Sequence, residues 1–245
     1  MAKRKKWIDA GDLHREVIYT PPKRSDDARV RAKKKKLSSE AQKRFNRKTS
    51  AFKLMLILAE NFNRGDLVVG LDYSDKYLPK NREEAQKRIK AFRAKLAKYY
   101  RARGRALLMV WNIEHLTDEG GRYHHHCVIN GTGEDLEILK KLWTFGGVDL
   151  ETLRVDKEKN YRTLAEYMAK EGPEKNSQRS WSYTRSCRQP EIDSRSVPDD
   201  TPLQVPKGAI LFEHIKENNQ YGYYEIIEYY LPTRKRVKTK RKRRR

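Results

Sequence analysis

Residues 106–130 read ALLMVWNIEHLTDEGGRYHHHCVIN, and this stretch determines the centre of the fold. It contains two apolar runs, 106–114 and 123–130, each of a length and composition typical of a β-strand. The segment between them, HLTDEGGR, is rich in turn-forming Asp, Glu and paired Gly residues. The sequence therefore predicts two neighbouring antiparallel strands joined by a short turn.

Helix and strand patterns flank this hairpin on both sides. Apolar spacing and capping residues predict helices over 39–61, 81–104, 132–142 and 160–172. Alternating patterns predict further strands over 67–73, 147–155 and 222–231, whereas the four prolines within 174–206 predict a loop-rich stretch. We expect an α+β fold, in which helices flank a mostly antiparallel central sheet.

The chain is strongly basic, and its charge lies at the two ends. Its 245 residues include 56 Lys and Arg against 33 Asp and Glu, a net charge of +23. Residues 1–50 carry +11 and residues 234–245 carry +10, so the middle is nearly neutral at +2. Blocks of like charge resist folding and attract polyanions, which indicates arms that bind nucleic acid. Solubility tails or a localisation signal are the alternative interpretation of these arms.

These patterns predict four parts of the chain. They are a basic N-terminal arm (1–37), a folded domain (38–190), a loop-rich extension with a late strand (191–233) and a basic tail (234–245). The tail residues expected to bind DNA are Arg234, Lys235, Arg236, Lys238, Lys240 and Arg241.

Several classes of protein are excluded. No apolar run approaches the roughly 20 residues of a membrane helix, and the basic start MAKRKKWIDAGDL lacks the apolar segment of a secretory signal. Two cysteines suit a reducing cytoplasm. No GxxxxGK[ST] segment is present, which argues against an ATP-driven motor.

Two histidines on one strand face suggest a metal site. Alternate side chains of a strand share a face, so His124 and His126 point one way and His125 the other. Glu114 ends the partner strand and is the candidate third ligand, with Asp118 or Glu119 as alternatives. The simpler interpretation is a set of surface histidines and a solvent-facing acid beside a turn.

Tyr167 and Lys170 form a second candidate group on the predicted helix 160–172. Residues three apart share a helix face, which brings phenol and ammonium together, whereas Tyr161 should face elsewhere. A free phenol has a pKa of about 10, so a nearby cation helps it to act as a nucleophile. A purely structural tyrosine is the alternative.

Together these motifs resemble the HUH endonuclease superfamily, in particular the single-tyrosine rolling-circle replication initiators of small phages, plasmids and prophages. The resemblance covers roughly residues 38–190 and rests on three segments. They are GDLVVGLDYSDKYLP, NIEHLTDEGGRYHHHCVIN, and YMAKEG with the WSYTRSCRQPE that follows it. Two positions depart from the family pattern. Gly70 and Asp72 replace the usual threonines, and His125 replaces an apolar residue, which leaves open a part for His125 in the site.

The resemblance implies a function and a set of site residues. His124, His126 and Glu114 are the implied metal ligands, Tyr167 the nucleophile and Lys170 its helper. The implied reaction nicks and rejoins single-stranded DNA at an origin, leaving a 5′-phosphotyrosine and a free 3′-OH. Mn²⁺ or Mg²⁺ suits a phosphate substrate better than Zn²⁺. The implied partners are origin DNA and a host helicase and polymerase, in a bacterial cytoplasm.

Three alternatives remain at this stage. A mobilisation relaxase or a single-tyrosine transposase uses the same chemistry, although the order of the motifs favours a replication initiator. A non-enzymatic nucleic-acid-binding protein with structural zinc is the third. Cys127 lies on the opposite strand face from His124 and His126, and no CxxC pair is present, which argues against such a zinc site.

Overall fold

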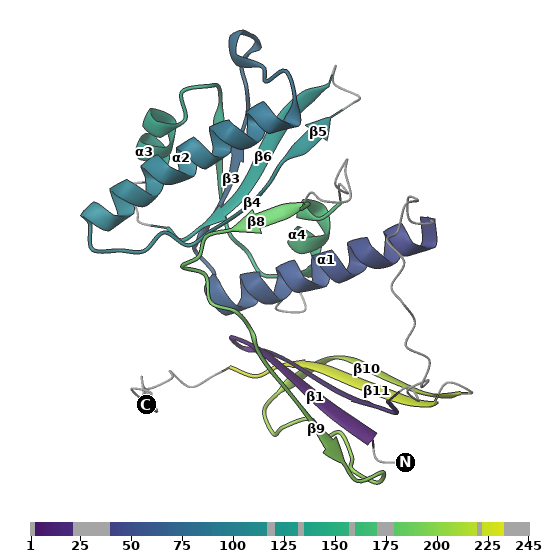
Figure 1. Ribbon diagram of the computed structural model, residues 1–245. Coiled ribbons are helices and arrows are strands. Elements are labelled where there is room, and N and C mark those ends of the chain that lie inside the picture. The colour runs from purple at the N-terminus through teal and green to yellow at the C-terminus, as the bar shows by residue number, and fades with distance from the viewer. Residues whose placement is uncertain are drawn as a thin grey trace, which may run out of the picture. The chain divides into compact units, whose positions relative to one another are not determined.

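The computed structural model describes residues 3–21, 40–116, 121–131, 135–156, 160–170, 179–219 and 222–232. The chain divides into two compact units, one of Val30–Gln189 and one of Met1–Arg29 with Pro190–Arg245. Each unit contains an antiparallel sheet (Figure 1). The α-helices of the described residues all belong to Val30–Gln189.

The unit Val30–Gln189 is built on a sheet with the strand order β7-β3-β6-β4-β8, and β5 pairs with β6 beside it. Its strands are β3 (Leu67–Leu71), β4 (Met109–Asn112), β5 (Glu114–Leu116), β6 (Arg122–Ile129), β7 (Val148–Thr152) and β8 (Trp181–Tyr183). Its helices are α1 (Glu40–Asn61), α2 (Arg82–Ala102), α3 (Asp135–Leu142) and α4 (Arg162–Met168), with a 3₁₀ turn over Asp75–Tyr77.

One face of this sheet is covered by α2 and α3 (Figure 1). The sequence forms α2 because apolar residues recur every three or four positions, and all of these lie buried: Ala85, Ile89, Phe92, Leu96 and Tyr100. They pack with Leu71, Met109 and Trp111 of the sheet and with Trp143 in one cluster. Burying each large side chain of this kind contributes about 2 kcal/mol.

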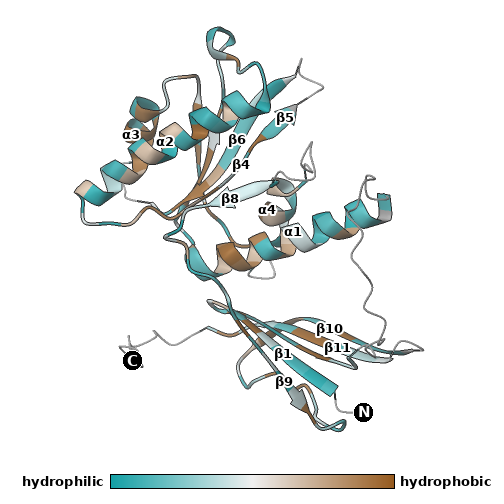
Figure 2. Cartoon of the chain, viewed as in Figure 1, coloured by the Kyte–Doolittle hydropathy of each residue, from teal (hydrophilic) through white to brown (hydrophobic). Residues whose placement is uncertain are grey.

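The other face is covered by α1 and α4 (Figure 1). Figure 2 shows that α1 changes from hydrophilic in its first half to hydrophobic in its second, where Leu54 and Leu58 are fully buried. The Tyr161 hydroxyl, just before α4, donates to the Phe62 carbonyl at 3.2 Å. Tyr161 is therefore a buried structural residue, and it faces away from the candidate site as expected.

The α+β prediction is confirmed, with a central antiparallel sheet and helices against it. The two strands within 106–130 pair antiparallel as predicted, since β4 and β5 both pair with β6. The last helix is shorter than predicted. It ends at Met168 rather than near residue 172, because Ala169 already adopts a non-helical capping conformation.

The second unit contains a five-stranded antiparallel sheet with the order β10-β11-β2-β1-β9. Its strands are β1 (Lys3–Ala10), β2 (Leu13–Tyr19), β9 (Glu191–Val197), β10 (Ile210–Asn219) and β11 (Gly222–Tyr230). Gly11 has a positive φ of 60°, which permits the tight turn between β1 and β2.

This second sheet corrects two predictions. Residues 3–19, assigned to a basic arm, form β1 and β2, because Ile8 and Leu13 are buried and Lys5 pairs with Glu16 at 2.6 Å. Within the stretch assigned to loops, residues 191–197 form β9, and β10 was also missed. The strand β9 is a polar edge strand, so it lacks the apolar alternation that identifies a strand in sequence. The late strand expected over 222–231 is β11.

No helix of the described residues is long and apolar enough to cross a membrane.

We predict that the cap of α2 stabilises the unit that contains it. Asn81 Oδ1 accepts from the Glu84 N–H at 2.9 Å, so Asn81→Ala should lower the free energy of unfolding by about 1 kcal/mol. Urea unfolding followed by circular dichroism measures the loss. The control Lys90→Ala, at an exposed position of the same helix, should change little. Equal losses for the two variants would contradict the capping role.

Candidate active site

The three histidines of β6 divide between the two faces of the sheet. His125 is 0% exposed and contacts the rings of Tyr73 and Trp143 on the face covered by α2. His124 and His126 are half-buried on the opposite face. The alternation predicted from sequence therefore holds, and the structure excludes His125 from the site.

His125 is held as a neutral core residue. The Tyr73 hydroxyl donates to its Nε2 at 2.8 Å, and its Nδ1 lies 3.3 Å from the Asn112 carbonyl, which can only accept. Burial lowers the pKa of His125 to about 3. The imidazole is thus committed to internal hydrogen bonds and takes no part in chemistry at the sheet surface.

Glu114 lies against the histidines of the exposed face. It begins β5 directly opposite His124 of β6, and its Oε2 is 2.6 Å from His126 Nε2. Only 5% of Glu114 is exposed, so the carboxylate is held in this position rather than extending into solvent. The structure brings Glu114 and His126 together as the sequence predicts.

Tyr167 reaches the same pair from α4. Its hydroxyl lies 3.0 Å from His126 Nε2 and donates to Glu114 Oε2 at 3.2 Å. The side chain is 44% exposed, which leaves it accessible to a substrate. A phenol, an imidazole and a carboxylate from three separate elements therefore meet at one point of the surface.

Asn112 fixes the distance between α4 and the sheet. This residue of β4 is buried, and its amide donates to the Met168 carbonyl at 3.0 Å, next to Tyr167. Its Oδ1 accepts from the His126 backbone N–H, also at 3.0 Å. One side chain thus connects the end of the helix that carries Tyr167 to the strand that carries His126.

Asp72 is a site residue that the sequence reasoning did not assign. Its Oδ1 accepts from His124 Nδ1. The signal was its position, two residues after Gly70 at the end of a strand, where the family pattern has a threonine. The sequence alone could not show that a carboxylate there would reach across to the neighbouring strand.

His124 is left with one unused ring nitrogen. Within the described part of the chain, its Nε2 is buried and has no hydrogen-bond partner. Since the proton sits on Nδ1, facing Asp72, the lone pair of Nε2 is available to an electrophile. A buried orphan of this kind is rare in proteins and points to a missing partner.

Lys170 is not beside Tyr167 in the way that a continuous helix predicts. It lies two residues beyond the end of α4, where its backbone N–H donates to the Tyr167 carbonyl at 3.1 Å. Its side chain is exposed. The shared helix face argued from sequence therefore does not apply, although the two residues remain neighbours.

The remaining candidates fall outside the described residues. These are Asp118 and Glu119 in the turn after β5, and the tail residues Arg234, Lys235, Arg236, Lys238, Lys240 and Arg241.

A metal-binding arrangement is not preformed in the described residues, where no three His, Cys, Asp or Glu side chains are grouped so as to hold an ion. Glu114 and His126 instead hydrogen-bond directly to each other.

Residues 66–172 match a family model of replication-associated proteins, the ORF2 type. The matched segment contains every residue of the site described above: Asp72, Asn112, Glu114, His124, His126, Tyr167 and Lys170. The match confirms the resemblance to replication-associated proteins that the sequence motifs indicate. Neither a curated protein nor a solved structure matches the chain significantly.

We predict that Asn112 positions α4. Asn112→Ala leaves the His126 N–H and the Met168 carbonyl without their partner, which should cost about 2 kcal/mol of unfolding free energy. Hydrogen exchange at the amides of Ala169 and Lys170, which bond to α4 carbonyls, should become faster.

Asn130→Ala is the matched control, because Asn130 makes equivalent backbone bonds to Ala106 and Leu108 at the far end of the same strands. It should destabilise the unit without this local effect. The role assigned to Asn112 is wrong if the two variants give the same exchange pattern.

Proposed function

We propose that this protein, whose residues 66–172 match a replication-associated family, initiates rolling-circle replication by nicking and rejoining single-stranded DNA at an origin. The observation that carries the proposal is the contact of the exposed Tyr167 hydroxyl with His126 and Glu114. A structural tyrosine would be buried, as Tyr161 is, rather than 44% exposed beside a histidine and an acid.

The proposed reaction is a transesterification by Tyr167. Its oxygen forms a bond to phosphorus while the bond from phosphorus to the 3′ oxygen of the preceding nucleotide breaks. The products are a 5′-phosphotyrosine and a 3′ oxygen that takes up a proton. Attack of a 3′-OH on the phosphotyrosine reverses the step, so rejoining needs no ATP.

The chain supplies groups for the proton and the charge. Glu114 Oε2 already accepts the hydrogen bond of the Tyr167 hydroxyl, so it can receive the phenol proton. Lys170 is exposed just beyond α4, where its ammonium favours the phenolate and the phosphate through charge. Asn112 keeps Tyr167 in place, and this positioning lowers the entropic part of the barrier.

The residues we propose as metal ligands are Glu114, His124 and His126, and the proposed ion is Mn²⁺ or Mg²⁺ rather than Zn²⁺. When bound, the ion would neutralise charge on a phosphate oxygen in the transition state. The orphaned Nε2 of His124 fits this role, because Asp72 holds the other ring nitrogen, and a carboxylate in that position orients a histidine toward a metal ion. Glu114 and His124 are directly opposite in β5 and β6, within reach of one ion.

Single-stranded DNA is the proposed substrate, with a host helicase and polymerase as further partners in a bacterial cytoplasm. The basic tail 234–245 would add phosphate contacts that strengthen binding without reading sequence. A gene of a phage, prophage or plasmid is the proposed source. A relaxase or a transposase would use the same site, and the name of the matched family favours replication.

A structural zinc site is disfavoured by Cys127. It is 1% exposed on the sheet face opposite His124 and His126, and burial raises the pKa of its thiol. A protonated thiol on the wrong face does not complete a zinc site.

We predict that Tyr167→Phe binds single-stranded DNA with normal affinity and forms no covalent adduct. Denaturing gel electrophoresis with labelled DNA measures the adduct, and peptide mapping locates it. Tyr161→Phe is the control. It loses only a buried hydrogen bond to Phe62 and should still form the adduct. An adduct in Tyr167→Phe, mapped to Tyr183 or another tyrosine, would show that the nucleophile is misassigned. Lys170→Ala should slow the reaction without stopping it.

We predict that metal binding depends on His124 and on Asp72 behind it. His124→Ala should abolish Mn²⁺ binding in titration calorimetry without DNA, and Asp72→Ala should weaken it about 10- to 100-fold. His126→Ala and Glu114→Gln should also bind Mn²⁺ poorly, and EDTA should stop cleavage. His214→Ala, in the other unit, is the control. Unchanged Mn²⁺ binding by His124→Ala, or full cleavage in EDTA, would exclude the metal site.

A further inference from the structure

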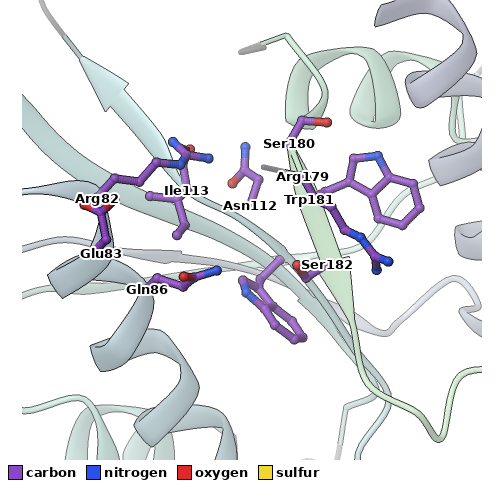
Figure 3. Close-up of a pocket in the computed structure, with 10 residues that line it drawn as sticks. Arg82, Glu83, Gln86, Asn112, Ile113, Arg179, Ser180, Trp181 and Ser182 are labelled. Carbon is purple, nitrogen blue, oxygen red and sulfur yellow. Dashed lines mark hydrogen bonds between the residues drawn. The ribbon is translucent and has the colours of Figure 1, made fainter. Parts of the chain in front are cut away.

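A cavity of about 330 Å³ lies where α2 begins, beside β4 and the edge strand β8. Its walls include Arg82 and Gln86 of α2, Trp111 of β4, and Trp181 and Ser182 of β8, with Arg179 just before β8 (Figure 3). Its size is at the lower end of the range for small-ligand pockets. None of these residues has a role in the site described above.

Arg82 is the feature of the cavity that calls for a ligand. It is only 7% exposed, yet the contacts of the described residues give its guanidinium a single hydrogen bond, to the Ile113 carbonyl at 3.1 Å. A guanidinium has five N–H donors, and a buried cation without an anion is costly. Arg179, at the same cavity, is exposed and adds a second positive charge. The two together fit a phosphate group.

The rest of the lining fits the other parts of a nucleotide. The indoles of Trp111 and Trp181 provide flat apolar surface, and Trp181 is held by a hydrogen bond from its Nε1 to Ser50 at 2.9 Å. Aromatic side chains of this kind stack with unpaired bases. Gln86 and Ser182 offer hydrogen bonds to base edges or sugar.

The cavity and the active site share a wall. Asn112 lines the cavity and also holds His126 and Met168 in place. The Ile113 carbonyl that binds Arg82 belongs to the residue just before Glu114, which contacts Tyr167. A strand with its scissile phosphate at Tyr167 therefore has a neighbouring nucleotide within reach of this cavity.

We infer that this cavity binds one nucleotide of the single-stranded substrate next to the scissile phosphate, with its phosphate at Arg82 and Arg179 and its base against the tryptophans. This inference rests on the function proposed above and adds a defined subsite to it. Glu83 also lines the cavity and would oppose a phosphate, but it is exposed, so solvent screens its charge. Glu83→Gln should therefore strengthen binding slightly.

A binding scan tests the subsite. The full-length protein carrying Tyr167→Phe is titrated with single-stranded oligonucleotides in which one phosphate at a time is replaced by a neutral methylphosphonate, and fluorescence anisotropy gives the affinity. One position beside the scissile phosphate should lose about tenfold in affinity. Arg179→Ala should lose about fivefold on the unmodified strand and become insensitive to the methylphosphonate at that position only.

Two further variants complete the scan. Arg101→Ala removes the same charge from an exposed position of α2 outside the cavity, and should remain fully sensitive to that methylphosphonate. Arg82→Gln should behave like Arg179→Ala with a larger loss. Because Arg179 is exposed, its variant keeps the test decisive even if Arg82→Gln fails to fold.

The outcomes separate this inference from the proposed function. If Arg179→Ala keeps the methylphosphonate response at every position, or if free deoxynucleoside monophosphate competes as well as the strand, the subsite is wrong. Adduct formation by the native protein would still support the nicking function in that case. If instead the coupling is found but the native protein forms no adduct, the subsite stands and the nicking function fails.

Discussion

The side-chain alternation of β6 is the constraint on which the site depends. His125 is fixed in the core by Tyr73 and Asn112, and burial keeps it neutral. A shift of one residue in register would place a core imidazole on the surface and two polar imidazoles in the apolar cluster under α2. The hydrogen bonds of His125 therefore fix which histidines face the substrate side, although His125 itself does no chemistry.

Asn112 extends this constraint from the sheet to α4. A helix of seven residues has few contacts of its own, so its position depends on what holds its ends. The Asn112 amide holds the C-terminal end through the Met168 carbonyl, and the Tyr161 hydroxyl holds the N-terminal end through Phe62. Tyr167 can thus be both exposed and accurately placed, two properties that conflict when a side chain is held only by its own burial.

The sequence predicted the parts of this structure that rest on local patterns. The period-two alternation of 123–130 and the apolar stripe of α2 were sufficient to predict their elements, and the pairing of β5 with β6 made Glu114 a correct neighbour for His126. Contacts between distant segments were not predictable in this way. Asp72 meets His124 only because β3 pairs with β6, and β1 is held by β9 from the far end of the chain. The cations of β1 also resemble a disordered run until their partners, such as Glu16, are known.

The division between catalysis and binding follows from where charge is fixed and where it is free. Around Tyr167 each polar group has a defined partner, and the orphaned Nε2 of His124 is the exception among the described residues. A polyanion held only by long-range attraction to the chain ends would slide along these groups without a register. A register requires a fixed contact beside the reacting phosphate, and a rigid buried cation supplies this better than a flexible tail can. The guanidinium of Arg82, which the described residues hold by one hydrogen bond to the peptide unit before Glu114, is a group of that kind.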